Sequence, residues 1–364
     1  MAKYIYQYDS WPHFRWDEQR LQPLLGKVRH LQGKLLGQMS AIGFAIREET
    51  VLSTLTLDVL KSSEIEGEIL NYDHVRSSIA RKLGIEYAGM VYPERNVDRI
   101  VEMMLDATQN YNTPLDEERL FGWHAALFPT GRSGMYKIEV ARYRTGEMQI
   151  VSGAMGKEKI HYEAPAPERV QAEMNAFLQW FNEDLTLDPV VKSGIAHFRF
   201  IIIHPFDDGN GRIARTLSDL LLAQADNTTQ RFYSLSSQIL TERKAYYEVL
   251  QKTQFSDGNI TEWLVWYLEC LYRALQATEA TFEKVLFKAD FWNSHETTEL
   301  NARQRLMLNR LLDRFEGKLT SSKWAKITKS SQNTALRDIQ DLVDKKILQK
   351  EPQGGRSTNY ELCR

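Results

Sequence analysis

The sequence predicts a mainly α-helical protein, and two observations carry this prediction. Apolar residues recur at three- and four-residue steps along most of the chain, which is the spacing of one face of a helix. The pairs Thr113-Pro114 and Asp188-Pro189 mark helix boundaries, because a residue before proline avoids the helical conformation. The exception is the stretch 143–164, where glycine is frequent and two short alternating runs predict a β-hairpin.

The helical pattern begins at Leu21 and extends to Leu60, before Gly67 and Asn71 interrupt it. By the same periodicity, we expect further helices at residues 96–111, 116–127, 168–183, 190–203, 212–224, 242–254 and 260–287. The side chains expected to face the core from the helix that starts at residue 212 are Leu217, Leu220, Leu221 and Leu222.

The composition is that of a folded globular protein. The chain has 364 residues, enough for two or three domains, and its 43% hydrophobic and 26% charged residues argue against disordered and collagen-like classes. The net charge of −2 excludes a uniformly basic nucleic-acid-binding protein but leaves room for one basic region. Cys270 and Cys363 are too few for a disulfide framework and too far apart for a zinc cluster.

The chain carries no recognisable targeting or membrane segment. Residues 1–16 mix aromatic and charged side chains and lack the apolar core of a signal peptide. The apolar runs at residues 201–203 and 220–222 are far shorter than the roughly 20 residues of a membrane span. We therefore expect a cytoplasmic protein without membrane association.

The most informative segment is residues 204–215, with the sequence HPFDDGNGRIAR. Its two glycines let the backbone approach an anion closely, and the positive end of the following helix points at the same place. Arg212 and Arg215 are three residues apart, so both lie on one helix face and can bind phosphate oxygens. Phe206 is expected to anchor the loop in the core.

Two further side chains of this segment supply chemistry. Asp208 offers the hard carboxylate that suits Mg²⁺, which binds through one or two carboxylates together with substrate phosphates. His204 is a base whose ordinary pKa lies near neutrality. Taken singly, each of these residues is usually part of a turn, but their combination predicts a polyphosphate site beside a metal and a proton acceptor. The chain has neither a GxxxxGK[ST] loop nor the protein-kinase motifs.

The segment resembles the signature of Fic-domain proteins, H-x-F-x-[DE]-G-N-G-R-x-x-R, and meets every specified position. The resemblance covers roughly residues 115–272 and implies an all-helical catalytic core with a β-hairpin flap. Most members of this family transfer AMP from ATP to a hydroxyl side chain of a protein and release pyrophosphate. On this basis we expect a helical region at 1–110, a Fic catalytic domain at 111–290 and a third domain at 298–364.

The resemblance also implies a role for each motif residue. His204 would take the proton of a Ser, Thr or Tyr hydroxyl on the target protein, and Asp208 would hold Mg²⁺ between the α- and β-phosphates of ATP. The family includes homodimers, although no residue of this chain indicates one. The resemblance assigns the binding of phosphate oxygens to Gly209, Asn210, Gly211, Arg212 and Arg215.

Two other segments match parts of the family. Ile160, His161 and Tyr162 correspond to a flap that holds the target segment by backbone pairing. Tyr246 and Tyr247 correspond to the region near the adenine of ATP. Paired tyrosines on a helix are also common core residues, so this second assignment has a structural alternative.

Upstream, residues 62–67 (SSEIEG) resemble the Fic inhibitory motif [ST]-x-x-x-E-[GN]. Ser62 and Glu66 are four residues apart on a helix expected around 50–67, hence on one face, and Gly67 suits a helix end. In relatives this Glu pairs with the second motif arginine, here Arg215, and keeps the γ-phosphate from its productive position. A second possibility from the resemblance is that Glu66 positions water for removing AMP, while the structural alternative is an exposed Glu before a terminal glycine.

The two ends of the chain differ from the central region. The aromatic-rich residues 4–16 are expected to pack against the core. Residues 317–364 carry ten Lys or Arg against five Asp or Glu. The tail resembles a winged helix, with helices at 300–315, 321–328 and 334–346 and a wing at 347–362 whose tip is 354–356. DNA is one candidate partner, but a protein-docking or structural role is the alternative, because the third of these helices carries three acidic residues, Asp338, Asp341 and Asp344.

The leading hypothesis is an autoinhibited protein adenylyltransferase that acts on a target protein and on itself. The alternative from a different class is a DNA-binding regulator or interaction module with a vestigial Fic core, against which the intact motif argues. Transfer of UMP, phosphocholine or phosphate stays open within the enzyme hypothesis, because the motif recognises phosphates better than bases.

Overall fold

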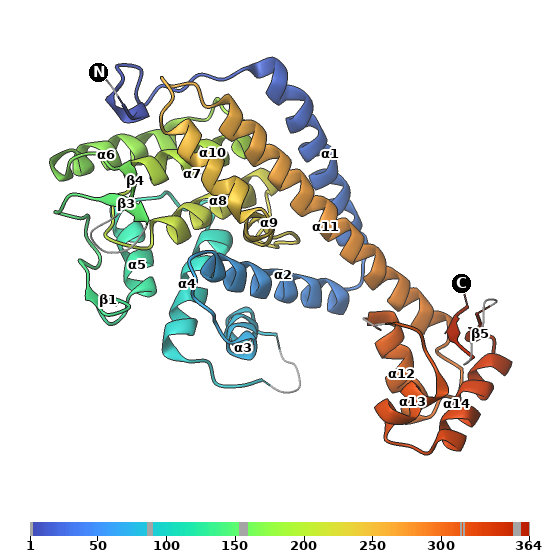
Figure 1. The fold of residues 1–364 in the computed structure, drawn as a ribbon. Coiled ribbons are helices and arrows are strands. Elements are labelled where there is room, and N and C mark those ends of the chain that lie inside the picture. The colour runs from blue at the N-terminus through green and yellow to red at the C-terminus, as the bar shows by residue number, and fades with distance from the viewer. Residues whose placement is uncertain are drawn as a thin grey trace. The chain divides into compact units, whose positions relative to one another are not determined.

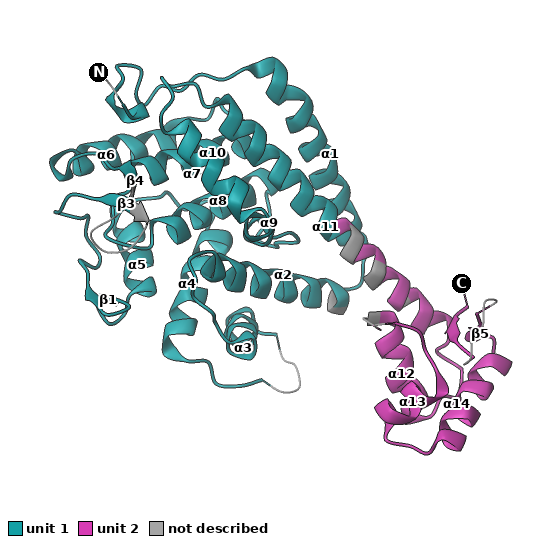
Figure 2. Ribbon diagram, viewed as in Figure 1, with its two compact units in different colours: residues 1–278 teal, residues 279–364 magenta. Residues whose placement is uncertain are grey.

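The computed structural model describes residues 3–85, 90–152, 159–313, 315, 317–351 and 358–363. The chain divides into two compact units, residues 1–278 and 279–364 (Figure 2). The predicted mainly α-helical class is confirmed, since helices dominate and the strands are short (Figure 1). The division between the units falls inside the long helix α11, and the domain boundaries expected from the sequence stay predictions.

The first unit contains the following elements. From the N-terminus, the first elements are the 3₁₀ helix η1 (Ile5–Gln7) and the helices α1 (Glu18–Ala41), α2 (Phe44–Ile65), α3 (Tyr72–Leu83), α4 (Arg95–Gln109) and α5 (Glu117–Leu127). The strands are β1 (Arg132–Ser133) and β2 (Tyr136–Lys137), then β3 (Gln149–Ser152) and β4 (Lys159–Glu163), which form two separate antiparallel pairs. After them come α6 (Pro167–Glu183), α7 (Pro189–Ile203), α8 (Asn210–Asp226), α9 (Leu235–Thr241), α10 (Arg243–Thr253) and α11 (Thr261–Ser294).

Local signals explain where the observed elements differ from the expected ones. The single helical run expected over 21–60 is two helices, because Gly43 takes an extended conformation and serves as the N-cap of α2. Asn71, expected as an interruption, is the N-cap of α3, where its side-chain oxygen accepts the N–H groups of Asp73 and His74. Helices α3 and α9 and the β1–β2 hairpin were not expected. Helix α9 and the hairpin are too short to show a clear period, whereas α3 has 12 residues and was missed although Val75, Ile79 and Leu83 follow helical spacing.

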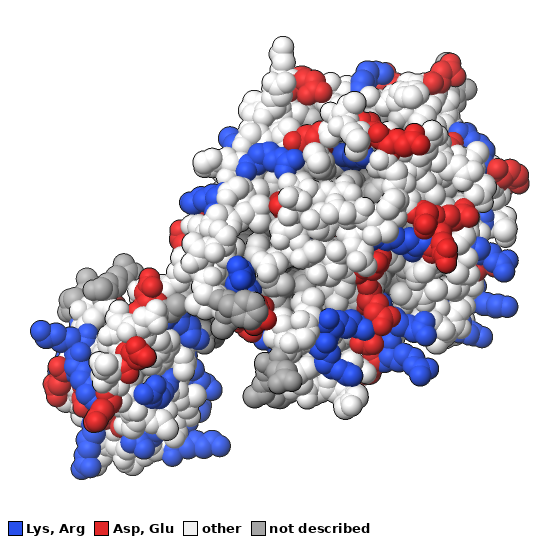
Figure 3. All heavy atoms as spheres, turned by 180° about the vertical axis from the view of Figure 1, so that it is seen from behind, with Lys and Arg blue, Asp and Glu red and all other residues white. Residues whose placement is uncertain are grey.

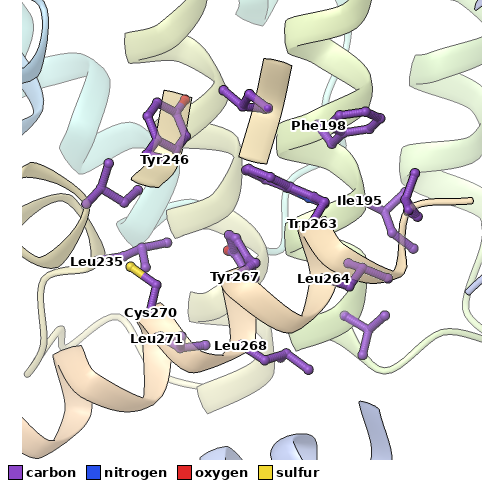
Figure 4. Close-up of a cluster of buried hydrophobic side chains, with 14 of the residues drawn as sticks. Ile195, Phe198, Leu235, Tyr246, Trp263, Leu264, Tyr267, Leu268, Cys270 and Leu271 are labelled. Carbon is purple, nitrogen blue, oxygen red and sulfur yellow. The ribbon is translucent and has the colours of Figure 1, made fainter. Parts of the chain in front are cut away.

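Helix α7 is the centre of the first unit. It begins at Asp188, whose side chain accepts the N–H of Val190, with Pro189 in the first turn. Side chains of α11, including Trp263 and Tyr267, pack against α7 in the cluster shown in Figure 4. Trp263 Nε1 also donates to the carbonyl oxygen of Gly194 at 2.8 Å. The predicted inward residues of α8 are buried as well, so α7 and α8 form a rigid support for the loop between them.

The aromatic N-terminal segment packs on the same unit. Tyr4 and Ile5 are buried, and the N–H of Ile5 donates to the carbonyl of Gln254 at 2.8 Å. The ring of Tyr4 lies edge-on to Tyr162 of β4, with 5.2 Å between ring centres. The hydroxyl of Tyr6 donates to the carbonyl of Glu163. The segment therefore fixes the base of the β3–β4 hairpin.

The second unit has its own small core. Its helices are α12 (Ala302–Asp313), α13 (Ser321–Thr328) and α14 (Gln332–Asp344), followed by the antiparallel strands β5 (Leu348–Lys350) and β6 (Tyr360–Leu362). Trp324, Ile339 and Leu342 lie in that core. These elements follow the order expected from the sequence. The identification as a winged helix stays a prediction, and the expected tip at 354–356 lies outside the described residues.

One acidic residue of α14 is not a free surface charge. Asp338 accepts two hydrogen bonds from Arg303, at 2.7 and 2.9 Å, and one from Asn301. Burial alone would raise the pKa of Asp338, but these hydrogen bonds outweigh it and lower the pKa. This carboxylate therefore holds α12 to α14, and the repulsion of DNA expected from Asp338 is weaker than the sequence suggests.

The face seen in Figure 3 shows no large area with charges of a single sign, because Lys and Arg are interspersed with Asp and Glu there. This agrees with the near-zero net charge of the chain. Among the residues that the structure describes, no helix is both long and apolar enough to cross a bilayer.

Close packing of α7 on α11 gives a testable consequence. A Cβ atom at Gly194 would lie 2.9 Å from Tyr267 Cδ1 and 3.1 Å from Leu264 Cδ2. We expect Gly194→Ala to lower the free energy of unfolding by about 1–2 kcal/mol in urea titrations, because overpacking outweighs the gain in helix propensity.

The control is Gly33→Ala in α1, where a Cβ atom would meet nothing within 4 Å. That change should raise the free energy of unfolding by roughly 0.5–1 kcal/mol. Equal effects of the two substitutions would contradict the packing described for α7.

Candidate active site

The loop between α7 and α8 is shaped by two residues with positive φ. His204 ends α7 at φ 50°, and Gly209 precedes α8 at φ 83°. A Cβ atom at Gly209 would lie 2.8 Å from the ring of Phe128, so only glycine fits this turn. The turn directs the first N–H groups of α8 away from the helix, where they have no partner inside α8 itself.

Asn210 and Phe206 hold the loop in place. Asn210 Oδ1 accepts the N–H of Phe206 at 3.0 Å, and Asn210 Nδ2 donates to the carbonyl of Phe206 at 2.7 Å. Phe206 is fully buried and stacks on His124 with 4.2 Å between ring centres. The sequence assigned Asn210 to phosphate oxygens, but its side chain stabilises the loop, which leaves only its backbone N–H for an anion.

His124 of α5 is a positioning residue that the sequence analysis missed. Its Nδ1 accepts the N–H of Ala141 at 3.2 Å, and its Nε2 contacts the carbonyl of Asp208 at 3.2 Å. Burial lowers the pKa of His124 to about 4, so the ring is neutral and Nε2 carries the proton that Asp208 accepts. His124 lies among apolar residues of its helix, so its sequence context indicates only a core residue.

Arg144 is a second positioning residue without a sequence signal. Its guanidinium donates to the carbonyls of His204, at 2.8 Å, of Gly146, at 2.8 Å, and of Pro165, at 2.5 Å. The backbone N–H of Arg144 also donates to the carbonyl of Pro205. Burial lowers the pKa of Arg144. One buried side chain thus joins the end of α7 to the two segments that flank the β3–β4 hairpin.

His204 has the geometry of a general base. Its Nδ1 lies 3.2 Å from the carbonyl oxygen of Ile201, which assigns the proton to Nδ1 and leaves the lone pair on Nε2. Burial lowers the pKa of His204 to about 4. The imidazole is therefore neutral near pH 7 and able to accept a proton.

Asp208 lies beside the start of α8. Its Oδ2 accepts the hydroxyl of Ser133 in β1, and its Oδ1 accepts the N–H of Gly209 at 2.6 Å. Among the described residues, no three His, Cys, Asp or Glu side chains form a ready-made metal site. A single carboxylate next to a phosphate-binding turn fits Mg²⁺, since this ion takes few protein ligands and completes its shell with phosphates and water.

The second motif arginine is already occupied by the residues of the inhibitory motif. Arg215 Nη2 donates to Glu66 Oε1 at 2.7 Å and to the carbonyl of Ser62 at 2.9 Å, while Nε donates to Ser62 Oγ at 2.9 Å. The Arg215 side chain is only 1% exposed. Burial alone would lower the pKa of Arg215, but the Glu66 carboxylate outweighs it and raises the pKa.

Glu66 also covers the backbone at the start of α8. A Cβ atom at Gly211 would lie 2.2 Å from Glu66 Oε1, so only glycine allows this close approach. The carboxylate rests at the positive end of the helix, where negative charge is stabilised. It therefore occupies the position that the sequence analysis assigned to a phosphate.

The first motif arginine has an acidic partner that the sequence analysis missed. Arg212 Nη1 donates to Glu68 Oε2 at 2.7 Å, and its guanidinium lies 5.0 Å above the ring centre of Phe128. Glu68 follows Gly67, two residues after Glu66. Its one sequence signal is this proximity to the inhibitory motif. Both motif arginines thus face carboxylates from the end of α2.

The flap residues have three different environments in β4. Ile160 is about half exposed. The side-chain amide of Gln251 contacts Nδ1 of His161, and the side-chain amide of Gln254 donates to the backbone carbonyl of His161. Tyr162 is buried, and its hydroxyl donates to the carbonyl of Ile202 at 2.6 Å. The register with β3 shifts between Ile150 and Val151, which pair with Tyr162 and Ile160, so His161 lies at a bulge of β4. The glycines at 153 and 156, on which the hairpin prediction partly rested, lie outside the described residues.

The two tyrosines of α10 differ as well. Tyr246 is buried, and its hydroxyl lies 2.9 Å from Nε2 of His197 inside the core cluster (Figure 4). Tyr247 is 43% exposed and packs against the ring of Tyr246 with 5.0 Å between ring centres. Of the pair, Tyr247 is the one accessible to a nucleotide base.

Fold and loop together define a helical domain that places His204 close to the N-terminus of α8. Residues 114–222 match the Fic/DOC family model, and the chain therefore contains a Fic domain. Residues 4–85 match a second model, described as a domain of unknown function, DUF4172.

Similar curated proteins are protein adenylyltransferases. The chain is 30% identical over 146 residues to protein adenylyltransferase Fic of Nematostella vectensis, covering 39% of this chain and 30% of that protein. It is 28% identical over 225 residues to protein adenylyltransferase Fic of Aedes aegypti, covering 60% of this chain and 40% of that protein. The matches thus span less than half the length of these relatives.

Solved structures share the fold. A Fic family protein from Desulfovibrio desulfuricans G20 superposes with a TM-score of 0.56 at 20% identity, covering 95% of this chain and 96% of that chain. A Fic domain containing signaling protein from Bacteroides thetaiotaomicron gives a TM-score of 0.50 at 19% identity, covering 71% of this chain and 95% of that chain.

The role of Arg144 is testable by unfolding. Arg144→Met removes three charged hydrogen bonds and leaves their carbonyls unpaired, so we expect a loss of about 3–5 kcal/mol in the free energy of unfolding. Arg142→Met is the matched control, because Arg142 is exposed and pairs only with Glu139; it should change the value by less than about 0.5 kcal/mol. Similar urea midpoints for both variants would refute the role of Arg144.

Proposed function

We propose that this chain is a protein adenylyltransferase, which transfers AMP from ATP to a hydroxyl side chain of a target protein and releases pyrophosphate. The observation that carries the proposal is the pairing of a neutral base, His204, with a helix start that bears two buried arginines. The printed names of the curated relatives support the same reaction.

Two buried hydrogen-bond donors without acceptors support an anion-binding site at the start of α8. Nη1 of Arg215 and Nε of Arg212 are buried and have no acceptor among the residues that the structure describes. Buried donors without partners are rare in folded proteins, and they mark sites where a ligand supplies the acceptor. Phosphate oxygens match the planar guanidinium geometry.

The proposed reaction needs little covalent chemistry from the protein. The Nε2 lone pair of His204 accepts the proton of the target hydroxyl as its oxygen attacks the α-phosphorus, and the bond to the pyrophosphate oxygen breaks. The N–H groups at the start of α8 and the two arginines stabilise the charge on the phosphate oxygens. Bound Mg²⁺, held by Asp208 and the phosphates, would supply charge neutralisation.

We further propose that the end of α2 inhibits this reaction. Glu66 and Glu68 occupy both arginines that phosphate requires, and Glu66 lies over Gly211. An incoming triphosphate would have to displace these carboxylates or bind out of line. Each 1.4 kcal/mol of lost transition-state stabilisation is a tenfold loss in rate.

The proposal is tested by incubating the purified full chain with Mg²⁺ and ATP labelled on the α-phosphate. We expect label on the chain itself, with the mass increase of one or more AMP groups. His204→Ala should lose at least 99% of the labelling while keeping the thermal unfolding temperature, because the base is removed. Label from γ-phosphate instead would identify a kinase, and label from UTP alone would identify a uridylyltransferase.

Removing the inhibitory carboxylate should raise the activity. We expect Glu66→Gly to increase self-labelling at least tenfold, since a charged hydrogen bond contributes about 1.5–3 kcal/mol. Glu68→Gln should give a smaller increase, because Arg215 keeps its partner.

The control for these variants is Glu64→Gly in the same helix turn. Glu64 pairs with Lys61 and contacts neither motif arginine, so its substitution should leave the rate within twofold of the parent. An unchanged rate in Glu66→Gly would remove the inhibitory assignment without affecting the transferase assignment.

The pH dependence follows from the lowered pKa of His204. With a pKa of about 4, the neutral base persists to pH 5.5, whereas an ordinary pKa near 6.5 would cut the active form to roughly a tenth at that pH. We expect kcat/KM of Glu66→Gly at saturating Mg²⁺ to change less than twofold between pH 7.5 and 5.5. A tenfold loss, with circular dichroism showing folded protein, would contradict the buried neutral imidazole.

A further inference from the structure

A groove of about 770 Å³ opens between the N-terminal segment and helices α6 and α7. Its walls combine apolar and aromatic side chains with polar ones, and they come from the N-terminal segment, from the region of α6 and from α7. Its apolar lining includes Pro12, Phe14, Trp16, Trp180, Leu187 and Ile195. A concave apolar surface of this size is typical of sites for small organic ligands.

One buried cation lines this groove without a partner. Arg199 of α7 is 3% exposed, and its guanidinium makes no hydrogen bond or ion pair with any residue that the structure describes. Its Nε and Nη2 atoms are both buried without acceptors. The guanidinium lies over the rings of Phe177 and Trp180, 5.6 and 5.4 Å from their centres.

Arg199 keeps its charge at neutral pH despite this environment. Burial lowers its pKa to about 10, partly opposed by Glu173, so the group is still a cation at pH 7. Glu173 does not pair with it, because its carboxylate accepts Trp11 Nε1 at 2.7 Å and Arg169 at 2.5 Å. A buried charge without a partner is costly, and the aromatic faces offset this cost only in part.

Two acidic residues, Glu183 and Asp184, line the groove themselves, but the hydrogen bonds they accept come from groups other than Arg199. Asp184 accepts the indole N–H of Trp180 at 3.0 Å and the N–H of Thr186 at 2.9 Å. Glu183 accepts the amide of Gln179 at 3.0 Å. The nearby cation Lys192 donates to the carbonyl of Asp184. An external anion is therefore the missing partner of Arg199.

We propose that this groove binds an organic acid whose carboxylate pairs with Arg199 and whose flat apolar body packs on the aromatic wall. The planar fork of the guanidinium suits a carboxylate, which accepts two parallel hydrogen bonds. Trp180 and Phe14 provide surfaces for an aromatic or similarly flat group. Two sources share this chemistry, a free aromatic acid and the carboxyl-terminal residue of a peptide.

The groove is separate from the candidate active site. Arg199 lies within α7, whereas His204 follows the helix in a left-handed conformation and belongs to the motif loop. No lining residue of the groove belongs to the motif loop or to the end of α2. Binding here therefore does not depend on the proposed transferase activity.

The test uses the full chain and tryptophan fluorescence, since Trp16 and Trp180 line the groove. The probes are phenylacetate and N-acetylphenylalanine, each compared with its neutral amide. We expect saturable quenching by at least one acid and at least tenfold weaker binding of the matching amide. Tighter binding of phenylacetate would indicate a free acid, and tighter binding of N-acetylphenylalanine would indicate a peptide terminus.

Three variants decide whether Arg199 is responsible. Arg199→Met should abolish binding without lowering the unfolding temperature, because it replaces an unpaired buried charge with an apolar chain. Trp180→Leu should weaken binding at least fivefold with Arg199 intact, which keeps the test decisive if Arg199→Met fails to fold. Arg15→Met is the matched control, since Arg15 is exposed and pairs with Asp257.

The proposal would be overturned by any of three results. These are the absence of saturable binding of both acids, equal binding of acid and amide, and unchanged binding in a folded Arg199→Met variant. If Arg199→Met does not fold, unchanged binding in Trp180→Leu has the same meaning.

Discussion

Burial of the Arg215 guanidinium is the constraint on which the site depends. Burying a charge is costly unless it is paired, and Glu66 at the end of α2 supplies an anion to this cation, which is 1% exposed. Under the proposed function, the same guanidinium would bind a nucleotide phosphate. Carboxylate and phosphate would then compete for one buried charge, and the balance between these two anions would set whether the loop at the start of α8 is open to substrate.

The rest of the first unit holds that charge in a fixed position. Helices α7 and α8 support the loop between them, and Phe206 fixes this loop by stacking on His124. Arg144 joins the end of α7 to both flanks of the hairpin. Chemistry is thus confined to a few groups at one helix end, while aromatic packing and buried hydrogen bonds determine where those groups point.

The sequence predicted most of the elements with a clear period or a capping residue, while the chemical roles of the motif residues stay predictions. The helices around the motif lie within a few residues of their expected bounds, because periodicity and proline boundaries are local signals. What could not be predicted depends on contacts between distant segments. Arg144, His124 and Glu68 acquire their roles only when the fold brings them to the loop. The motif does not reveal that the side chain of Asn210 bonds the backbone of Phe206, and its assignment to phosphate stays a prediction for its backbone N–H.

The ion pairs Glu66–Arg215 and Glu68–Arg212 join two parts of a single polypeptide. The local concentration of the two carboxylates around the arginines is therefore set by the fold and is unaffected by dilution of the protein. Changes in expression level leave this contact intact. Under the proposed function, a signal that releases it would act on the segment that carries the two carboxylates or on the arginines of α8 that they contact.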